Sequence, residues 1–163
     1  IFVNDIEWYE MMNPNNRTKG TYLRENWEPI QHQVETFTEY LNVIPEIQMV
    51  HTGGHSNGHS IILLKQGNET MIHMADLLLT HAHRKPVWVA AVDDYPMRSI
   101  IAKEKWLKEA FENHYKFFFY HDQFFAVVEF DHEGKEIVDY VKRIREPRLP
   151  FTDKQDRKPV LYH

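Results

Sequence analysis

The feature that most constrains the fold is a pair of apolar segments separated by a short Gly-Asn turn. Residues 60–64 are almost entirely apolar, Gln66-Gly67-Asn68 follow, and residues 70–74 form the partner segment. Apolar segments of this length, bounded by turn residues, are typical of two β-strands joined in a hairpin. The sequence therefore predicts a buried β-hairpin around which the other elements must be arranged.

The other apolar patterns predict an α/β fold, a mixed sheet with flanking helices. Pro96 is favourable at the first position of a helix, and the amphipathic segment after it predicts the longest helix of the chain. Residues 136–145 fit a helix and a strand equally well. No regular alternation of strands and helices indicates a Rossmann fold or a barrel. Further strands are expected at residues 1–3, 34–37, 47–50, 117–120 and 124–130, and helices at 6–12, within 18–26 and at 96–114. The aromatic run 117–120 is expected to pack in the core, and His73 is expected to have a structural role.

The length of 163 residues is typical of one domain with one core. Residues 1–146 are expected to form that unit, whereas residues 147–163 are polar and rich in proline, which predicts a surface tail. The first residue is Ile1 instead of Met, and it opens an apolar strand. We interpret this start as a sign of a fragment of a longer protein.

The composition excludes several classes of function. The net charge of −5, from 19 basic and 24 acidic residues, gives no basic footprint for nucleic acid. No apolar run reaches the roughly 18 residues that span a membrane, and the start does not resemble a signal peptide. We therefore expect a cytoplasmic protein with a small-molecule partner. Cysteine is absent while histidine occurs 11 times, so any metal must bind to histidine and carboxylate side chains, as in catalytic sites.

Three residues of metal-ligand type fall at the ends of expected strands. They are His55, Asp76 and His121, and they are 21 and 45 residues apart. Such long gaps exclude a local zinc finger and require a site assembled by the tertiary fold. His55 alone is more simply explained as an ordinary turn residue, and His121 alone is a weak candidate. The position of Asp76 after an apolar strand favours a site role. The hypothesis therefore depends on the series.

The sequence around these residues resembles the metallo-β-lactamase superfamily of hydrolases. Residues 51–60, His-Thr-Gly-Gly-His-Ser-Asn-Gly-His-Ser, resemble its Gly-His-Ser/Thr-x-Gly-His segment. Residues 74–77 resemble the later segment that carries a bridging Asp, and residues 120–122 resemble the segment of the last ligand His. The match runs from about residue 1 to 130. It implies the C-terminal half of an αββα sandwich.

A finer resemblance concerns one branch of that superfamily. Thr80-His81-Ala82-His83, the region of Trp88 and Asp93-Asp94-Tyr95-Pro96 before a long helix are most similar to N-acyl homoserine lactonases and methyl parathion hydrolase-like enzymes. This resemblance implies a lactonase of the quorum-quenching type. Some lactonases of this fold have a Tyr three residues after the bridging Asp, where this chain has Leu79.

The resemblance also implies a role for each residue. His55 would complete the site of a first divalent cation, His121 would bind a second, and the catalytic Asp76 would bridge the two, which are expected to be zinc. The other ligands would come from a His-x-His-x-Asp-His motif that these 163 residues do not contain. The site in this chain is then incomplete. Residues expected to support the ligands or line the pocket are His59, His81, His83 and Trp88.

Two classes of function follow. In the first, the parent protein hydrolyses a lactone or ester by means of a hydroxide shared between two metals, and this chain alone is inactive; phosphotriester and β-lactam hydrolysis are the alternatives within this class. In the second, the chain is a non-catalytic half-domain. One half of a sandwich leaves an apolar sheet face uncovered, which favours self-association or pairing with a separate N-terminal half.

Overall fold

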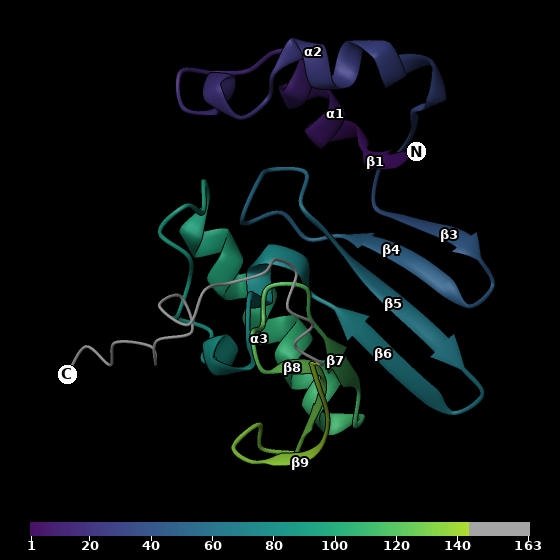
Figure 1. Cartoon of the computed structure of the whole chain (residues 1–163), viewed down its shortest axis with the longest axis vertical. Coiled ribbons are helices and arrows are strands. Elements are labelled where there is room, and N and C mark those ends of the chain that lie inside the picture. Colours follow the sequence, from purple (N-terminus) through teal and green to yellow (C-terminus); the bar gives the residue numbers. More distant parts are fainter. Residues whose placement is uncertain (144–163) are drawn as a thin grey trace, which may run out of the picture.

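The computed structural model describes residues 1–143, so the tail expected at 147–163 lies outside the described residues. The described chain contains one seven-stranded mixed sheet (Figure 1). The mixed α/β fold expected from the sequence is confirmed. The strands are, in their order across the sheet, β3 (Tyr40–Ile44), β4 (Ile47–His51), β5 (Ser60–Gln66), β6 (Glu69–His73), β7 (Lys116–Phe118), β8 (Phe125–Phe130) and β9 (Ile137–Lys142).

The expected hairpin is the pair β5 and β6. Its strands are antiparallel and in register from Ile62 opposite His73 to Gln66 opposite Glu69. Gly67 occupies the turn with a φ of 59°, a left-handed conformation that glycine adopts without steric cost. The hairpin places Ile61, Leu63 and Ile72 in the core, as its apolar pattern predicts.

Helix α3 (Pro96–Glu112) lies in the long connection between β6 and β7. These two strands are parallel, and a parallel pair requires a crossover of this kind. One face of the helix, including Trp106, Leu107 and Ala110, is buried in the same core cluster as Phe117 and Ile72 of the sheet. The helix therefore packs its apolar face against the sheet.

The N-terminal residues form a separate group above the main sheet (Figure 1). The side chain of Asn4 accepts a hydrogen bond from the Ile6 backbone N–H at 3.0 Å, which caps the first helix. A short parallel pair of strands, outside the main sheet, closes this group. Its elements are β1 (Phe2–Asn4), α1 (Asp5–Met12), η1 (Thr18–Gly20), α2 (Arg24–Trp27), η2 (Glu28–Gln33) and β2 (Glu35–Phe37).

Two elements differ from the sequence expectations or complete them. Strand β3 was not expected, because Asn42 and Pro45 interrupt its apolar pattern; it is an edge strand whose side chains alternate between half-buried and exposed. The ambiguous segment 136–145 contains strand β9, which forms the opposite edge. The side chains of β3 are half-buried or exposed, and those of β9 are almost all exposed, so burial imposes no strong apolar pattern on either strand.

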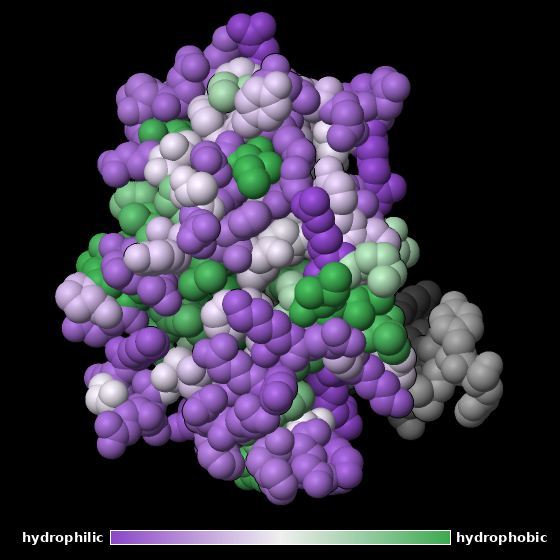
Figure 2. Space-filling model, turned by 180° about the vertical axis from the view of Figure 1, so that it is seen from behind, coloured by the Kyte–Doolittle hydropathy of each residue, from purple (hydrophilic) through white to green (hydrophobic). Residues whose placement is uncertain are grey.

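Within residues 1–143, no helix is both long and apolar enough to cross a lipid bilayer. The face turned away from the view of Figure 1 is largely hydrophilic, with smaller hydrophobic groups across its middle (Figure 2). Polar residues interrupt the hydrophobic groups on that face.

Candidate metal site

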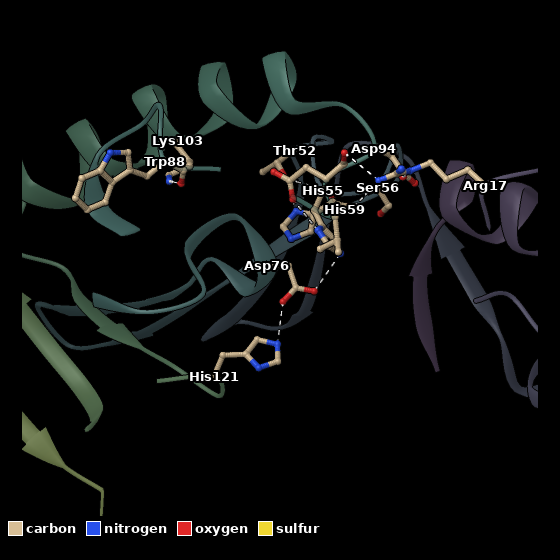
Figure 3. A network of polar contacts seen from close by, with 12 residues as sticks. Arg17, Thr52, His55, Ser56, His59, Asp76, Trp88, Asp94, Lys103 and His121 are labelled. Atoms are coloured by element: carbon tan, nitrogen blue, oxygen red, sulfur yellow. Dashed lines mark hydrogen bonds and ion pairs between the residues drawn. The ribbon is translucent and has the colours of Figure 1, made fainter. Parts of the chain in front are cut away.

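The structure brings His55, Asp76 and His121 together at the C-terminal ends of the inner strands β6 and β7 (Figure 3). His55 lies in the loop between β4 and β5, Asp76 directly after β6 in the short helix η3 (Ala75–Leu78), and His121 shortly after β7. Because β6 and β7 are parallel neighbours, their C-terminal ends lie side by side. That topology explains how residues 45 positions apart in the sequence become neighbours.

Asp76 lies between the two imidazole rings. Nε2 of His55 is 3.2 Å from Asp76 Oδ2, and Nε2 of His121 is 3.2 Å from Asp76 Oδ1. Within the described part of the chain, no three His, Asp or Glu side chains are grouped so as to hold one metal ion. The site is therefore two His–Asp pairs that share one carboxylate. Imidazole nitrogen and carboxylate oxygen are ligands that zinc and similar divalent cations accept, so the chemistry of these side chains fits a divalent cation.

The second ring nitrogen of His55 is held by a carboxylate. Nδ1 lies 2.9 Å from Oδ1 of Asp93, whose side chain is 2% exposed. Histidines that bind metals commonly donate their other N–H to such a group, which fixes the ring orientation. Sequence reasoning did not assign this role to Asp93, although it noted the segment 93–96, because 38 residues separate the pair.

The loop that carries His55 is held by backbone contacts with the start of α3. The N–H of Asp94 donates to the carbonyl of His55 at 2.9 Å, and the N–H of Tyr95 donates to that of Gly54 at 3.0 Å. Gly54 has a φ of 109°, and a Cβ there would lie 2.9 Å from the backbone N of Ser99. Only glycine, which has no Cβ, allows the loop to lie this close to α3.

Helix α1 holds the same loop from the opposite side. The carboxylate of Glu7 accepts hydrogen bonds from Ser56 Oγ at 2.6 Å and from the Gly58 N–H at 3.1 Å. It also accepts one from the Tyr22 hydroxyl at 2.5 Å, and burial raises the pKa of Tyr22. A Cβ on Gly58 would lie 2.3 Å from the backbone N of Glu7. The ligand loop is thus packed between α1 and α3.

His59 is buried behind the ligand loop. Its Nδ1 lies 2.8 Å from Thr52 Oγ1, and its ring centre lies 6.1 Å from that of His55. Burial lowers the pKa of His59 to about 4, and the nearby His55 adds to this shift, so the ring is neutral at physiological pH. Its Nε2 has no hydrogen-bond partner among the described residues.

Tyr120 contradicts one expectation. The aromatic run 117–120 was expected to be core packing, and Phe117 and Phe119 are indeed buried, but Tyr120 is 49% exposed. Its hydroxyl donates a hydrogen bond to Oδ1 of Asp76. Alternation along the chain explains the difference, because it puts residues 117 and 119 on the core side and residue 120 on the other.

A cavity of about 650 Å³ opens beside the site. His55, Asp76 and the buried His59 line it, together with residues of the N-terminal group such as Glu7 and Arg17. This volume is typical of a small-molecule site.

The other expected pocket residues lie outside the lining of this cavity. His81 Nδ1 is 2.5 Å from Oδ2 of the buried Asp122, and His83 Nδ1 is 2.8 Å from Thr80 Oγ1. Trp88 is 49% exposed and lies away from Asp76 (Figure 3).

Comparison with known proteins gave matches among solved structures only. No protein-family model matches the chain, and no curated protein does. A probable metal-dependent hydrolase from Staphylococcus aureus is 37% identical with a TM-score of 0.86, over 89% of this chain and 52% of the hydrolase. The hydrolase AbOPH of the β-lactamase superfamily is 17% identical with a TM-score of 0.69, over 89% and 55% of the two chains. This chain has the fold of the C-terminal half of a metallo-β-lactamase-fold hydrolase.

The remaining matches include AidC, a dizinc quorum-quenching lactonase in complex with a product. It is 17% identical with a TM-score of 0.66, over 90% of this chain and 55% of the lactonase. The present chain thus spans about half the length of the structures it matches. At this identity, AidC and AbOPH show the fold alone.

Proposed function

We propose that this metallo-β-lactamase half-fold carries part of the active site of a two-metal hydrolase that acts on lactones or related esters. The observation that carries the proposal is the position of Asp76, whose two oxygens each lie 3.2 Å from the Nε2 of a different histidine. A carboxylate placed in this way can bridge two cations. The carboxylate of Asp93 on His55 supports the proposal, because it orients the ring as metal sites require.

His55, Asp76 and His121 would hold the cations, which we propose to be zinc. When bound, two divalent cations activate a water and polarise the scissile carbonyl. The chain's own residues orient the ligands: Asp93 fixes the ring of His55, and the loop around it is held by α1 and α3. The cavity beside Asp76 is large enough for a small acyl substrate.

The lactone class is supported by the structures that share this fold. AidC is in complex with a product, and an N-acyl homoserine lactone hydrolase of 19% identity has N-hexanoyl-L-homoserine at its metal centre. We propose the same class for this chain, with Leu79 in place of the Tyr that some of these enzymes have.

The proposed partner is a further polypeptide segment that supplies the remaining ligands. The matched structures support it, because this chain spans only 52% of one and 55% of another. The segment would lie within the same protein or in a separate chain.

The test uses the longer protein that contains these residues. Asp76→Ala is expected to lower bound zinc and to reduce hydrolysis of N-acyl homoserine lactones about 100-fold or more, because both cations lose a ligand. Asp139→Ala, which changes an exposed carboxylate on β9, is the matched control. Elemental analysis and a panel of lactones and phosphotriesters give the two readouts. Full zinc content and full activity in Asp76→Ala would refute the proposal.

A further inference from the structure

The backbone just before Asp76 is strained. Ala75 has a φ of 46°, in the left-handed region that residues with a Cβ rarely adopt. Such conformations persist only where surrounding contacts hold them, and they concentrate at functional sites. The turn at Ala75 directs the chain away from β6 and places Asp76 beside the end of that strand.

His73 supplies the contact that holds this turn. Its Nδ1 accepts a hydrogen bond from the Ala75 N–H at 2.8 Å. A ring nitrogen can accept only when it carries no proton, and burial lowers the pKa of His73, which favours this neutral form. The last residue of β6 thus fixes the turn that follows it.

The same ring supports Tyr120 through its face. The rings of His73 and Tyr120 stack with centres 5.0 Å apart and an angle of 18°, while Phe118 packs edge-on against His73 at 4.6 Å. The Tyr120 hydroxyl, held by this stack, donates to Oδ1 of Asp76, the oxygen that faces His121. His73 therefore supports Asp76 in two ways. Its hydrogen bond from the Ala75 N–H fixes the backbone, and its ring stacks on Tyr120, which bonds to Asp76.

We infer that His73 and Tyr120 form a cradle that positions Asp76 between His55 and His121, His73 by fixing the Ala75 turn and Tyr120 by holding one carboxylate oxygen. The inference rests on the proposed function, because it assigns the cradle to the metal-bridging carboxylate. It gives both residues a positioning role. Resemblance alone does not assign either role, and His73 had been interpreted as structural.

Variants of these residues separate the backbone contribution from the contribution of Tyr120. His73→Phe retains a ring against Tyr120 and removes the acceptor for the Ala75 N–H. His73→Asn retains an acceptor at the same distance along the side chain and removes the ring. Ala75→Gly removes the penalty of the left-handed turn, and Tyr120→Phe removes the hydroxyl alone. Tyr140→Phe is the matched control, since Tyr140 is 50% exposed and its hydroxyl bonds to no described residue.

The first readout needs no metal. In urea unfolding with a chelator present, His73→Phe is expected to raise the unfolding equilibrium constant about tenfold, through a lost hydrogen bond and an unsupported turn. Adding Ala75→Gly should recover most of that loss, and His73→Asn should lose less than His73→Phe. Tyr120→Phe should raise the constant more than Tyr140→Phe does. Failure of Ala75→Gly to recover the loss would overturn the role of His73.

The second readout is the zinc Kd of the longer protein, measured by competition with a chromophoric chelator. Tyr120→Phe and His73→Phe are expected to weaken zinc binding about tenfold or more, as loss of groups that orient ligands does, while Tyr140→Phe should leave it within about twofold. Zinc binding that is equally tight in Tyr120→Phe and Tyr140→Phe would overturn the cradle. If the unmodified protein binds no zinc, the proposed function fails, and urea unfolding alone decides whether the cradle exists.

Discussion

Lys103 offers the sharpest test of the packing around the site. It lies on α3, is 0% exposed, and its ammonium group donates to three backbone carbonyls. The acceptors are His83 at 2.7 Å, Lys85 at 3.0 Å and Trp88 at 2.6 Å. Lys103 thus ties residues 83–88 to the helix. Lys103→Met keeps a flexible side chain of similar length and removes every donor.

The expected cost follows from these contacts. Hydrogen bonds to a charged donor are each worth about 1.5–3 kcal/mol, so three would set an upper bound of about 9 kcal/mol. The acceptors belong to half-buried or exposed residues, so water replaces part of the loss. Methionine also avoids the cost of burying a charge. We expect a net loss of about 2–4 kcal/mol, or a fall in Tm of roughly 6–12 °C.

The pH dependence of stability tests the role of Lys103 independently. Burial lowers the pKa of Lys103 to about 8, whereas an unfolded lysine titrates near 10.4. Between these values the unfolded chain binds more protons than the folded one, so the contribution of Lys103 to stability rises with pH. The stability gap between the unmodified protein and Lys103→Met should therefore widen from about pH 8 to about pH 10.

Urea unfolding of both proteins at several pH values between about 7 and 10 measures this gap. Titration of the tyrosines affects both proteins equally, so it cancels in the difference between their free energies of unfolding. Thermal unfolding at neutral pH gives the change in Tm, and a fall below about 1 °C would show that water replaces the ammonium at no cost. A gap that stays constant or narrows with pH would refute the assigned direction of the pKa shift.

Two further predictions concern the ligand loop. Asp93→Asn keeps the shape of the side chain but removes the charge that holds His55, so the zinc Kd of the proposed longer protein should rise about 10–100-fold in chelator competition; an unchanged Kd would contradict the assignment. Gly58→Ala places a Cβ 2.3 Å from the Glu7 backbone and should cost about 2–3 kcal/mol in urea unfolding. Gly20→Ala, with open space around it, should stay within about 0.5 kcal/mol, and equal costs would argue against close packing of α1 on the loop.

The elements with strong local signals could be predicted from the sequence. The hairpin of β5 and β6 combines two apolar segments with a Gly-Asn turn, and α3 begins at a proline; both appear as expected. The edges of the sheet could not be predicted in the same way. Their solvated faces weaken the apolar pattern, so β3 was missed and the segment containing β9 stayed ambiguous.

The site was predictable because its residues follow expected strands and lie in segments that resemble the metallo-β-lactamase superfamily. His55, Asp76 and His121 were proposed on both grounds, and the structure places them within contact distance. Asp93 had no such local signal, because its partner lies 38 residues away across the fold. Tyr120 was misassigned because an aromatic run was interpreted as a whole, although successive side chains of an extended chain point to opposite faces.

The three proposed ligands are not held equally. His55 has a buried carboxylate on its second nitrogen and a loop fixed on both sides, and Asp76 has the turn at Ala75 and the hydroxyl of Tyr120. His121 is different, because its side chain is 51% exposed and its polar contact within residues 1–143 is with Asp76. Ordering a side chain on binding costs conformational entropy, which preorganisation avoids. Metal binding should therefore cost less conformational entropy at the His55 side of Asp76 than at the His121 side, so the two proposed cations are expected to bind with unequal affinity.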